Sequence, residues 1–404
     1  MTDPSFGADR EGLEAALGLL LRELAEPSGA ALDLPATLPQ EGAGELDALA
    51  RLAPAAIGGA RRLGDPGFLA HMDPPTPWVT WAGVQWAAAL NQNLLHLDSA
   101  PVARELEERV VAWLAPFFGM TGGHLVPGSS VANLTALWAA RELRGVEEVV
   151  ASEAAHVSVP KAAAILGLRY RAADLRDPGS LARSALVLTA GTTVTGAVDP
   201  LHAGADAAWR HVDAAWAGPL RLSERHAVLL DGIETADSVA VSGHKWLFQP
   251  KESALILFAD AGRAHQAISF GSGYLAQPNV GVLGSHGASA LPLAATLLAW
   301  GRSGTAERIE RCMDIAARLC KLIEADERLE LCSGPETGVV VWGPLGDIDL
   351  DALRAGMERG FVSITELDGA RRLRSVSANP MADPELVVAE VLRAATRLGG
   401  TRSS

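Results

Sequence analysis

The chain has 404 residues, of which 49% are hydrophobic, and a formal net charge of −14. This length can bury a large core, and the composition is typical of an α/β enzyme. The acidic balance argues against a nucleic-acid partner bound by a basic surface. The three cysteines lack metal-ligand or paired spacing, so we interpret them as reduced core residues and expect no metal site. No signal peptide or membrane-length apolar run occurs, so we expect a cytoplasmic protein without membrane contact.

Two amphipathic helices are predicted near the start of the chain, over residues 10–26 and 44–63, with a Pro- and Gly-rich link between them. We predict that residues 1–65 form a helical arm that packs on another surface. A rigid, proline-rich segment follows over residues 66–75. The next tryptophans are interpreted as core or interface residues rather than as a binding site, and they are Trp78, Trp81 and Trp86.

A turn with the sequence Gly128-Ser129-Ser130 precedes an apolar helix over residues 134–143. It comes after an amphipathic helix predicted over residues 102–118. Backbone N–H groups, two hydroxyls and the positive end of a helix dipole make the turn a candidate phosphate site. An ordinary helix cap is the alternative.

Short apolar segments alternate with helix-length segments in the middle of the chain. The predicted strands cover residues 149–152, 169–171, 185–189, 209–213, 238–242 and 253–258. This order predicts an α/β fold with a mostly parallel, doubly wound sheet and right-handed crossovers. Ligand-binding groups of such sheets lie at the carboxyl ends of the strands, and the polar residues found there are His156, Thr192, Thr193, Asp213 and Lys245.

Lys245 lies in the sequence Ser-Gly-His-Lys-Trp, at the turn between two apolar strands. A lysine in this place must be exposed or paired, because burial of an unpaired ammonium is costly. The alternative is that its amine forms an imine with an aldehyde cofactor. The pKa of lysine falls readily on burial, which suits this chemistry.

The last part of the chain predicts a second, smaller domain. Residues 270–281 are glycine-rich and predict a mobile loop, and helices are predicted over residues 288–300 and 306–325. Strands and helices then alternate, with strands over 339–342, 361–365 and 373–377 and helices over 350–359 and 383–398. We therefore predict a large domain over residues 66–299 and a small C-terminal α/β domain over residues 300–404.

Five motifs follow one another in a fixed order, at residues 128–133, 156, 189–200, 212–218 and 242–246. Together they resemble the group II pyridoxal-phosphate-dependent amino acid decarboxylases, which include glutamate, aromatic amino acid and diaminobutyrate decarboxylases. The resemblance covers residues 66–290 and returns at residues 373–380. It implies a fold-type-I, transferase-like enzyme with pyridoxal 5′-phosphate as cofactor, an amino acid as substrate, and a homodimer with shared active sites.

The resemblance also implies how the cofactor is held. Lys245 forms the imine, and Asp213 faces the pyridine nitrogen, whose protonation makes the ring a better electron acceptor. A turn cap is the alternative for Asp213. The other implied contacts are the ring-stacking His156, the small Ala215, Thr192 beside the aspartate, and the phosphate-binding Ser129, Ser130, Ser242 and His244.

For the substrate, the resemblance implies that Arg374 binds the α-carboxylate, a task that suits a planar guanidinium. A surface arginine is the alternative. His71 and His286 are further substrate-binding candidates, and His286 stands where many relatives have an arginine. Tyr274 is implied to return a proton to Cα from a loop of the neighbouring subunit. The alternative is that Tyr274 packs against the partner chain.

We therefore predict α-decarboxylation of an L-amino acid to an amine and CO₂ through an external aldimine and a quinonoid. Another reaction of the same cofactor, such as oxidative deamination, aldol-type cleavage or transamination, stays open because a fold does not settle the reaction. A non-catalytic cofactor-binding protein is a rival from another class, against which the intact set of Lys245, Asp213 and His156 argues. The sequence does not identify the substrate side chain.

Overall fold

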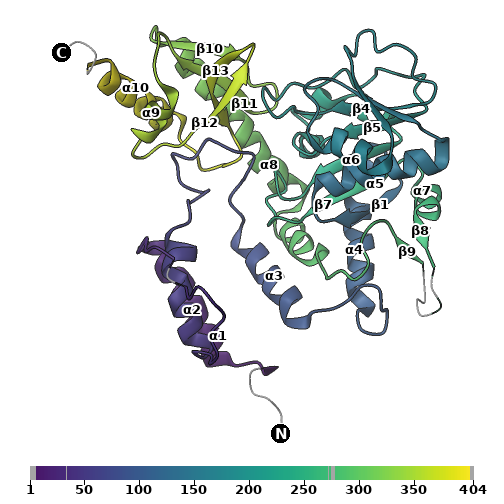
Figure 1. Cartoon of the computed structure of the whole chain (residues 1–404), viewed down its shortest axis with the longest axis horizontal. Coiled ribbons are helices and arrows are strands. Elements are labelled where there is room, and N and C mark those ends of the chain that lie inside the picture. Colours follow the sequence, from purple (N-terminus) through teal and green to yellow (C-terminus); the bar gives the residue numbers. More distant parts are fainter. Residues whose placement is uncertain (1–5, 33, 272, 274–277, 401–404) are drawn as a thin grey trace. The chain divides into compact units, whose positions relative to one another are not determined.

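The computed structural model describes residues 6–32, 34–271, 273 and 278–400, which divide into the compact units Met1–Arg62 and Leu63–Ser404 (Figure 1). The first unit contains α1 (Arg10–Ala25) and α2 (Glu45–Ala53). The second helix ends earlier than predicted, because Pro54 lacks an N–H and the chain widens there into a π-helical turn, Pro54–Gly58. Leucines of α1 are about half exposed within this unit, as Leu13, Leu17 and Leu21 show at 52% each.

A sheet of seven strands forms the centre of the second unit, in the order β1-β7-β6-β5-β4-β2-β3. Within this sheet β7 runs antiparallel to both neighbours and the other pairs are parallel, which confirms the mostly parallel fold. The strands are β1 (Gly122–Val126), β2 (Glu148–Ala151), β3 (Arg169–Ala172), β4 (Ser184–Thr189), β5 (Trp209–Asp213), β6 (Ser238–Ser242) and β7 (Ala254–Phe258).

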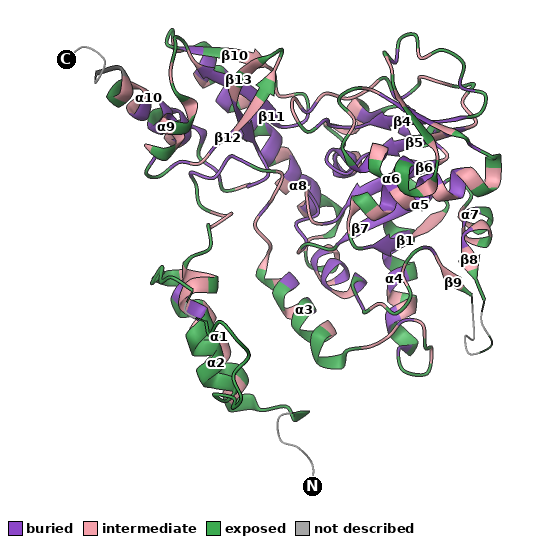
Figure 2. Cartoon of the chain, in the orientation of Figure 1, coloured by how far each residue is buried: buried purple, intermediate pink, exposed green. Residues whose placement is uncertain are grey.

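Helices cover both faces of this sheet, and Figure 2 shows its central strands as buried. Successive strand side chains point to opposite faces, so Val187 packs with one layer and Leu186 with the other. The first layer contains α5 (Ser129–Arg144), α6 (Ser158–Leu166) and α7 (Ala261–Ala267). The second contains α4 (Pro101–Leu114), the 3₁₀ turn Ala115–Phe118 and the first half of α8 (Ala290–Glu324).

The helices predicted over residues 288–300 and 306–325 form one element, α8 (Ala290–Glu324), with a break at Gly301. Gly301 has φ 62° and ψ −175°, a conformation that favours glycine. Leu293 packs on the seven-stranded sheet, whereas Leu319, beyond the break, packs in a separate core. The predicted boundary at residue 300 lies next to this break, and the division into residues 66–299 and 300–404 stays a proposal.

The smaller C-terminal domain contains an antiparallel sheet in the order β10-β11-β13-β12. A bridge between Phe68 and Phe361 attaches the segment before α3 (Trp78–Leu90) to this domain. The domain's strands and helices are β10 (Leu329–Ser333), β11 (Val339–Pro344), β12 (Ser363–Leu367), β13 (Ala370–Val376), α9 (Leu350–Ala355) and α10 (Pro384–Gly400).

The tryptophans of α3 (Trp78–Leu90) are not core residues of this chain, because Trp78, Trp81 and Trp86 are 73%, 41% and 61% exposed. Of the two interpretations from the sequence, only the interface stays a prediction. The predicted mobile loop begins and ends in a short antiparallel pair, β8 (Ser269–Phe270) and β9 (Asn279–Val280). Tyr274 lies outside the described residues. In the described part of the chain, no helix is both long and apolar enough to cross a membrane.

Candidate active site

Three neighbouring strands bring the predicted site residues to one edge of the large sheet. Asp213 is the last residue of β5, Ser242 is the last residue of β6, and Lys245 lies in the turn that follows. Because β4, β5 and β6 are parallel, their carboxyl ends meet at this edge. The backbone N–H of Ala190, just after β4, donates to the carbonyl of Asp213 at 2.9 Å.

The carboxylate of Asp213 is buried and held by two donors. Its Oδ2 accepts a hydrogen bond of 2.8 Å from Nδ2 of Asn133, and its Oδ1 accepts one of 3.1 Å from the N–H of Ala215. A carboxylate has about four acceptor sites, so it can take a further donor. An ionised carboxylate held in this way can bind a protonated ring nitrogen.

The amine of Lys245 is suited to covalent chemistry. Burial lowers the pKa of Lys245, while the nearby negative charge of Asp213 opposes this effect. Among the described residues, its Nζ has no hydrogen-bond or ion-pair partner. Lys251, the nearest lysine in sequence, is instead exposed and forms an ion pair with Asp73. Lys245 is therefore the lysine with access to a neutral, nucleophilic amine.

The turn before α5 matches the predicted phosphate site. Gly128, with φ 110°, allows the turn, and no side chain caps the helix. The N–H groups of Ser129 and Ser130 begin the helix and have no partner within it. Ser129 Oγ lies 2.6 Å from Ser242 Oγ, so the two hydroxyls lie together.

His244 lies beside this turn, where its Nδ1 lies 3.0 Å from the carbonyl of Ser253 and donates to it. Burial lowers the pKa of His244 to about 4. An anion bound near its Nε2 would favour the protonated form.

His156 precedes α6, and its side chain is exposed at one side while neighbouring atoms surround the rest of the ring. Burial of its ring lowers the pKa of His156, and the negative charge of Asp213 raises it, so the two residues are close. Ala215 is buried next to Asp213. The structure does not show the support that Thr192 was predicted to give Asp213. Its hydroxyl bonds to Thr195 at 3.0 Å, and Asn133 supports the carboxylate instead.

Arg374 lies on β13 of the smaller domain and is only 8% exposed. Burial lowers the pKa of Arg374 to about 10, and Asp73 opposes this shift. Nη1 donates to Ser363 Oγ at 3.5 Å, but Nε has no partner within the described part of the chain. His71 is nearby in the fold, since the same Ser363 hydroxyl donates to the carbonyl of Ala70 at 2.8 Å. Its ring lies 6.3 Å from that of Phe68.

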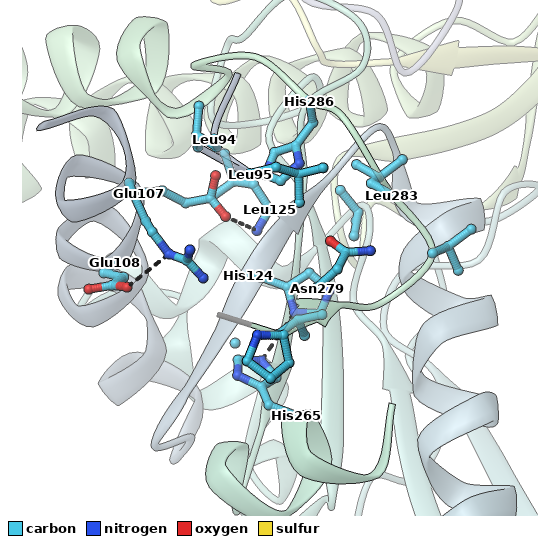
Figure 3. A pocket seen from close by; sticks show the side chains of 16 residues that line it. Leu94, Leu95, Glu107, Glu108, His124, Leu125, His265, Asn279, Leu283 and His286 are labelled. Atoms are coloured by element: carbon cyan, nitrogen blue, oxygen red, sulfur yellow. Dashed lines mark hydrogen bonds and ion pairs between the residues drawn. The ribbon is translucent and has the colours of Figure 1, made fainter. Parts of the chain in front are cut away.

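His286 lines two cavities, one of about 470 Å³ that it shares with Lys251 and Ser253 and one of about 130 Å³, shown in Figure 3. Glu107, His124 and His265 also line the smaller cavity, and none of the other predicted site residues does. Burial raises the pKa of Glu107, whose Oε1 accepts from the N–H of Leu125 at 3.2 Å. The described residues contain no cluster of three or more side chains that could hold a metal ion.

Residues 29–343 match the family model described as the pyridoxal-dependent decarboxylase conserved domain. The chain belongs to the pyridoxal-dependent decarboxylase family. This match covers most of the chain and confirms the resemblance that the ordered motifs indicated. The protein is a pyridoxal-phosphate-dependent amino acid decarboxylase.

Individual relatives agree with the family. L-2,4-diaminobutyrate decarboxylase of Rhizobium meliloti (strain 1021) is 30% identical over 403 residues, covering 87% of this chain and 81% of the relative. Aromatic-L-amino-acid decarboxylase of Bacillus atrophaeus is 25% identical over 376 residues, and the match covers 79% of this chain and 78% of the relative. The crystal structure of Oryza sativa TDC with PLP and tryptamine superposes with a TM-score of 0.83 at 22% identity, covering 98% and 99% of the two chains.

The residues at the sheet edge fit the family's cofactor, pyridoxal phosphate. An aldehyde requires an uncharged amine, which Lys245 can supply because burial lowers its pKa. The pyridine nitrogen requires an acceptor, and Asp213 has a free acceptor site. The phosphate requires hydrogen-bond donors, and the start of α5 offers backbone N–H groups that no side chain caps.

Sequence reasoning missed Asn133, which donates to Asp213, and the buried Ser158 and His211, which bond to Asn133. Two spacings carried a signal. Asn133 follows Ser129 by four residues, which places both on one side of α5. His211 precedes Asp213 by two residues, which places both on one face of β5.

Proposed function

We propose that this decarboxylase binds the α-carboxylate of an L-amino acid with Arg374, anchors its cofactor with Lys245 and binds the cofactor ring nitrogen with Asp213. One observation carries the proposal. The buried amine of Lys245 lies under the electrostatic influence of both the buried carboxylate of Asp213 and the guanidinium of Arg374, which is buried without a full set of partners in the described part of the chain. Perturbed groups of this kind cluster at functional sites.

Bound pyridoxal phosphate supplies a ring that accepts the electron pair released when the bond from Cα to the carboxylate breaks. Asp213 keeps the ring nitrogen protonated, because its fixed carboxylate is an acceptor in a buried site. Lys245 provides the amine that exchanges with that of the substrate. The flat guanidinium of Arg374 offers two parallel donors to a carboxylate and orients it.

The remaining assignments are also proposals. Ser129, Ser130 and Ser242 hold the phosphate from the start of α5, and His244 contacts it from the lysine turn. His156 and Ala215 contact opposite faces of the ring. For the other predicted contacts we propose that His71 and His286 bind substrate, that Thr192 lines the cofactor site, and that Tyr274 returns a proton to Cα.

We also propose that the protein is a homodimer with shared active sites. The exposed aromatic residues on α3 and the exposed leucines on α1 support this, since large apolar side chains of this kind gather at interfaces. The three cysteines are free, which fits a reducing, cytoplasmic environment. Size-exclusion chromatography with light scattering measures the molar mass of the protein in solution. A monomer at micromolar concentration would contradict a site shared between two subunits.

A panel of amino acids tests the reaction. The panel includes diaminobutyrate, aspartate and aromatic amino acids, with CO₂, amine, aldehyde and oxygen measured together. Decarboxylation predicts equal amounts of CO₂ and amine without oxygen uptake. Aldehyde formation with oxygen uptake would favour oxidative deamination, and a loss of substrate without CO₂ would favour transamination or aldol-type cleavage. Arg374→Gln serves as the control with weakened carboxylate binding.

A further inference from the structure

A chain of buried hydrogen bonds runs from the interior of the large sheet to two predicted cofactor contacts. It begins at Trp209, whose indole N–H donates to Ser238 Oγ at 2.9 Å, and this oxygen lies 2.9 Å from His211 Nδ1. His211 Nε2 lies 3.0 Å from Asn133 Oδ1. Asn133 Nδ2 then donates to Asp213 Oδ2 at 2.8 Å and to Ser158 Oγ at 2.9 Å.

The direction of each hydrogen bond follows from its members. A carboxylate only accepts, so the amide atom of Asn133 that faces Asp213 is the nitrogen. The oxygen of Asn133 therefore faces His211 and requires a donor, which fixes the proton of His211 on Nε2. Nδ1 of His211 lies 2.9 Å from the hydroxyl of Ser238 and 3.2 Å from the backbone carbonyl of Ser238. With the proton of His211 on Nε2, Nδ1 accepts from the nearer hydroxyl, whose oxygen is occupied by the indole donor of Trp209, and the longer contact with the carbonyl is not a hydrogen bond.

The second branch of the chain ends at His156. Ser158 Oγ accepts from Asn133, so its own proton is directed to His156 Nδ1, 2.8 Å away. The backbone N–H of Ser158 also points at this nitrogen, at 3.2 Å, and a backbone N–H can only donate. His156 must therefore carry its proton on Nε2, at the other end of the ring.

We propose that His211 and Asn133 are positioning residues that hold Asp213 as an oriented hydrogen-bond acceptor and fix His156 in its Nε2–H form. Both are completely buried, and their hydrogen bonds end at the two residues assigned to the cofactor ring. Burial lowers the pKa of His211 to about 4, so it stays neutral and keeps the donor that orients Asn133 at ordinary pH. The catalytic meaning of this inference rests on the proposed function. The directions of the hydrogen bonds follow from the structure alone and do not rest on it.

The first experiment uses the cofactor-free, full-length protein labelled with ¹⁵N-histidine. Nitrogen NMR spectra distinguish a protonated from an unprotonated ring nitrogen at each histidine. The proposal predicts the Nε2–H form for both His211 and His156 at neutral pH. An Nδ1–H form at either residue overturns the proposal, and this result does not depend on the activity or the substrate of the enzyme.

The second experiment measures the Kd of pyridoxamine 5′-phosphate, which presents the same ring nitrogen but has no aldehyde to react with Lys245. Asn133→Leu and His211→Phe should weaken binding at least about tenfold, since a lost hydrogen bond to a charged group has an effect of that order. His211→Gln keeps an N–H donor and should recover most of the affinity. A merely structural role would not produce this recovery.

Thr135→Val is the matched control, because Thr135 is buried on the same helix and its hydroxyl bonds only to the carbonyl of Val131 among the described residues. Its Kd should stay within about twofold of the parent. An unchanged Kd in folded Asn133→Leu overturns the proposal. Failure of the parent protein to bind pyridoxamine phosphate would instead count against the proposed cofactor site, and the NMR result would still decide the proton positions.

Discussion

Arg374 donates one long hydrogen bond, from Nη1 to the hydroxyl of Ser363 at 3.5 Å. Its Nε has no partner among the described residues, although the side chain is buried. A buried cation without a full set of partners costs stability, so a natural protein that retains one requires another reason for it. A carboxylate supplied by the substrate is such a reason.

We therefore expect Arg374→Met to be more stable and less active than the parent. Loss of the buried charge should raise the free energy of unfolding by roughly 1 kcal/mol. Loss of two charge-assisted donors should lower kcat/KM by about 100-fold or more. Urea unfolding and steady-state kinetics test the two parts. Arg372→Met on the same strand is the control, since Arg372 forms a surface ion pair with Glu330 at 3.5 Å.

Lys245→Ala should bind pyridoxal phosphate through the phosphate and Asp213 but lack the visible absorption of the lysine-linked cofactor. Lys251→Ala should keep this absorption, because Lys251 is exposed and paired with Asp73. Absorption spectra of both purified variants provide the measurement. An unchanged spectrum in Lys245→Ala would show that a different lysine is the anchor.

Asp213→Asn should lose most turnover and some stability. The loss of the negative charge should lower kcat by roughly 10²- to 10³-fold, as for other preorganised electrostatic groups. Both oxygens of Asp213 accept hydrogen bonds, and an asparagine offers a single acceptor, so one donor must lose its partner. We expect a destabilisation of about 1–3 kcal/mol, measured by urea unfolding.

Asp237→Asn is a control for the Asp213 variant. Asp237 lies at the opposite end of the sheet, where its carboxylate accepts from the N–H of Arg210 at 2.8 Å. This control should lose stability but keep the kcat of the parent. A parent-like kcat in Asp213→Asn would exclude the proposed role of the carboxylate.

The stability of the protein should fall in mild acid because of His211. Its folded-state pKa is about 4, below the ordinary value of 6.5, so the unfolded state binds more protons between these pH values. The contribution is complete above pH 6.5 and decreases as the pH falls towards 4, by about 1.4 kcal/mol per pH unit. His124 and His244, with pKa values of about 3 and 4, act in the same direction. Urea unfolding at successive pH values gives the slope of the free energy of unfolding against pH. In His211→Gln this slope should decrease by the equivalent of one bound proton between pH 4 and pH 6.5.

Tyr274→Phe should keep cofactor binding but lose most amine production, since the phenol is the proposed proton donor to Cα. Tyr170→Phe is the matched control, because Tyr170 lies on the edge strand β3, away from the site. Amine formation by the two variants is compared at saturating substrate. Equal rates for Tyr274→Phe and the parent would rule out this donor and direct attention to His156 or His286.

The parallel part of the fold was readily predicted from the sequence. The buried strands β4 and β6 are largely apolar runs, and the predicted bounds of β4, β5 and β6 agree with the structure to within one residue. Strand β1 escaped prediction because it begins with Gly122, Gly123 and His124, which have no strand pattern. It is a strand because it pairs with β7. Pairing of this kind is a tertiary property.

Site residues that belong to a sequence motif were predictable, whereas residues that reach the site only through tertiary packing were not. Lys245 and Asp213 lie in recognisable sequences, and the structure brings them together. Asn133 and His211 are 78 residues apart and meet only because α5 lies across β5. A single sequence does not reveal such a contact. The hydrogen bond that Thr192 forms with Thr195 is equally invisible in a motif.

The cofactor candidates follow strands of the parallel sheet, whereas Arg374 belongs to the antiparallel sheet of the smaller domain. The proposed site therefore takes residues from two separately packed sheets, with the amine of Lys245 under the electrostatic influence of Arg374. If Arg374 binds the α-carboxylate as proposed, a change in how the two sheets pack against each other would shift the substrate relative to the cofactor without altering any residue that contacts either.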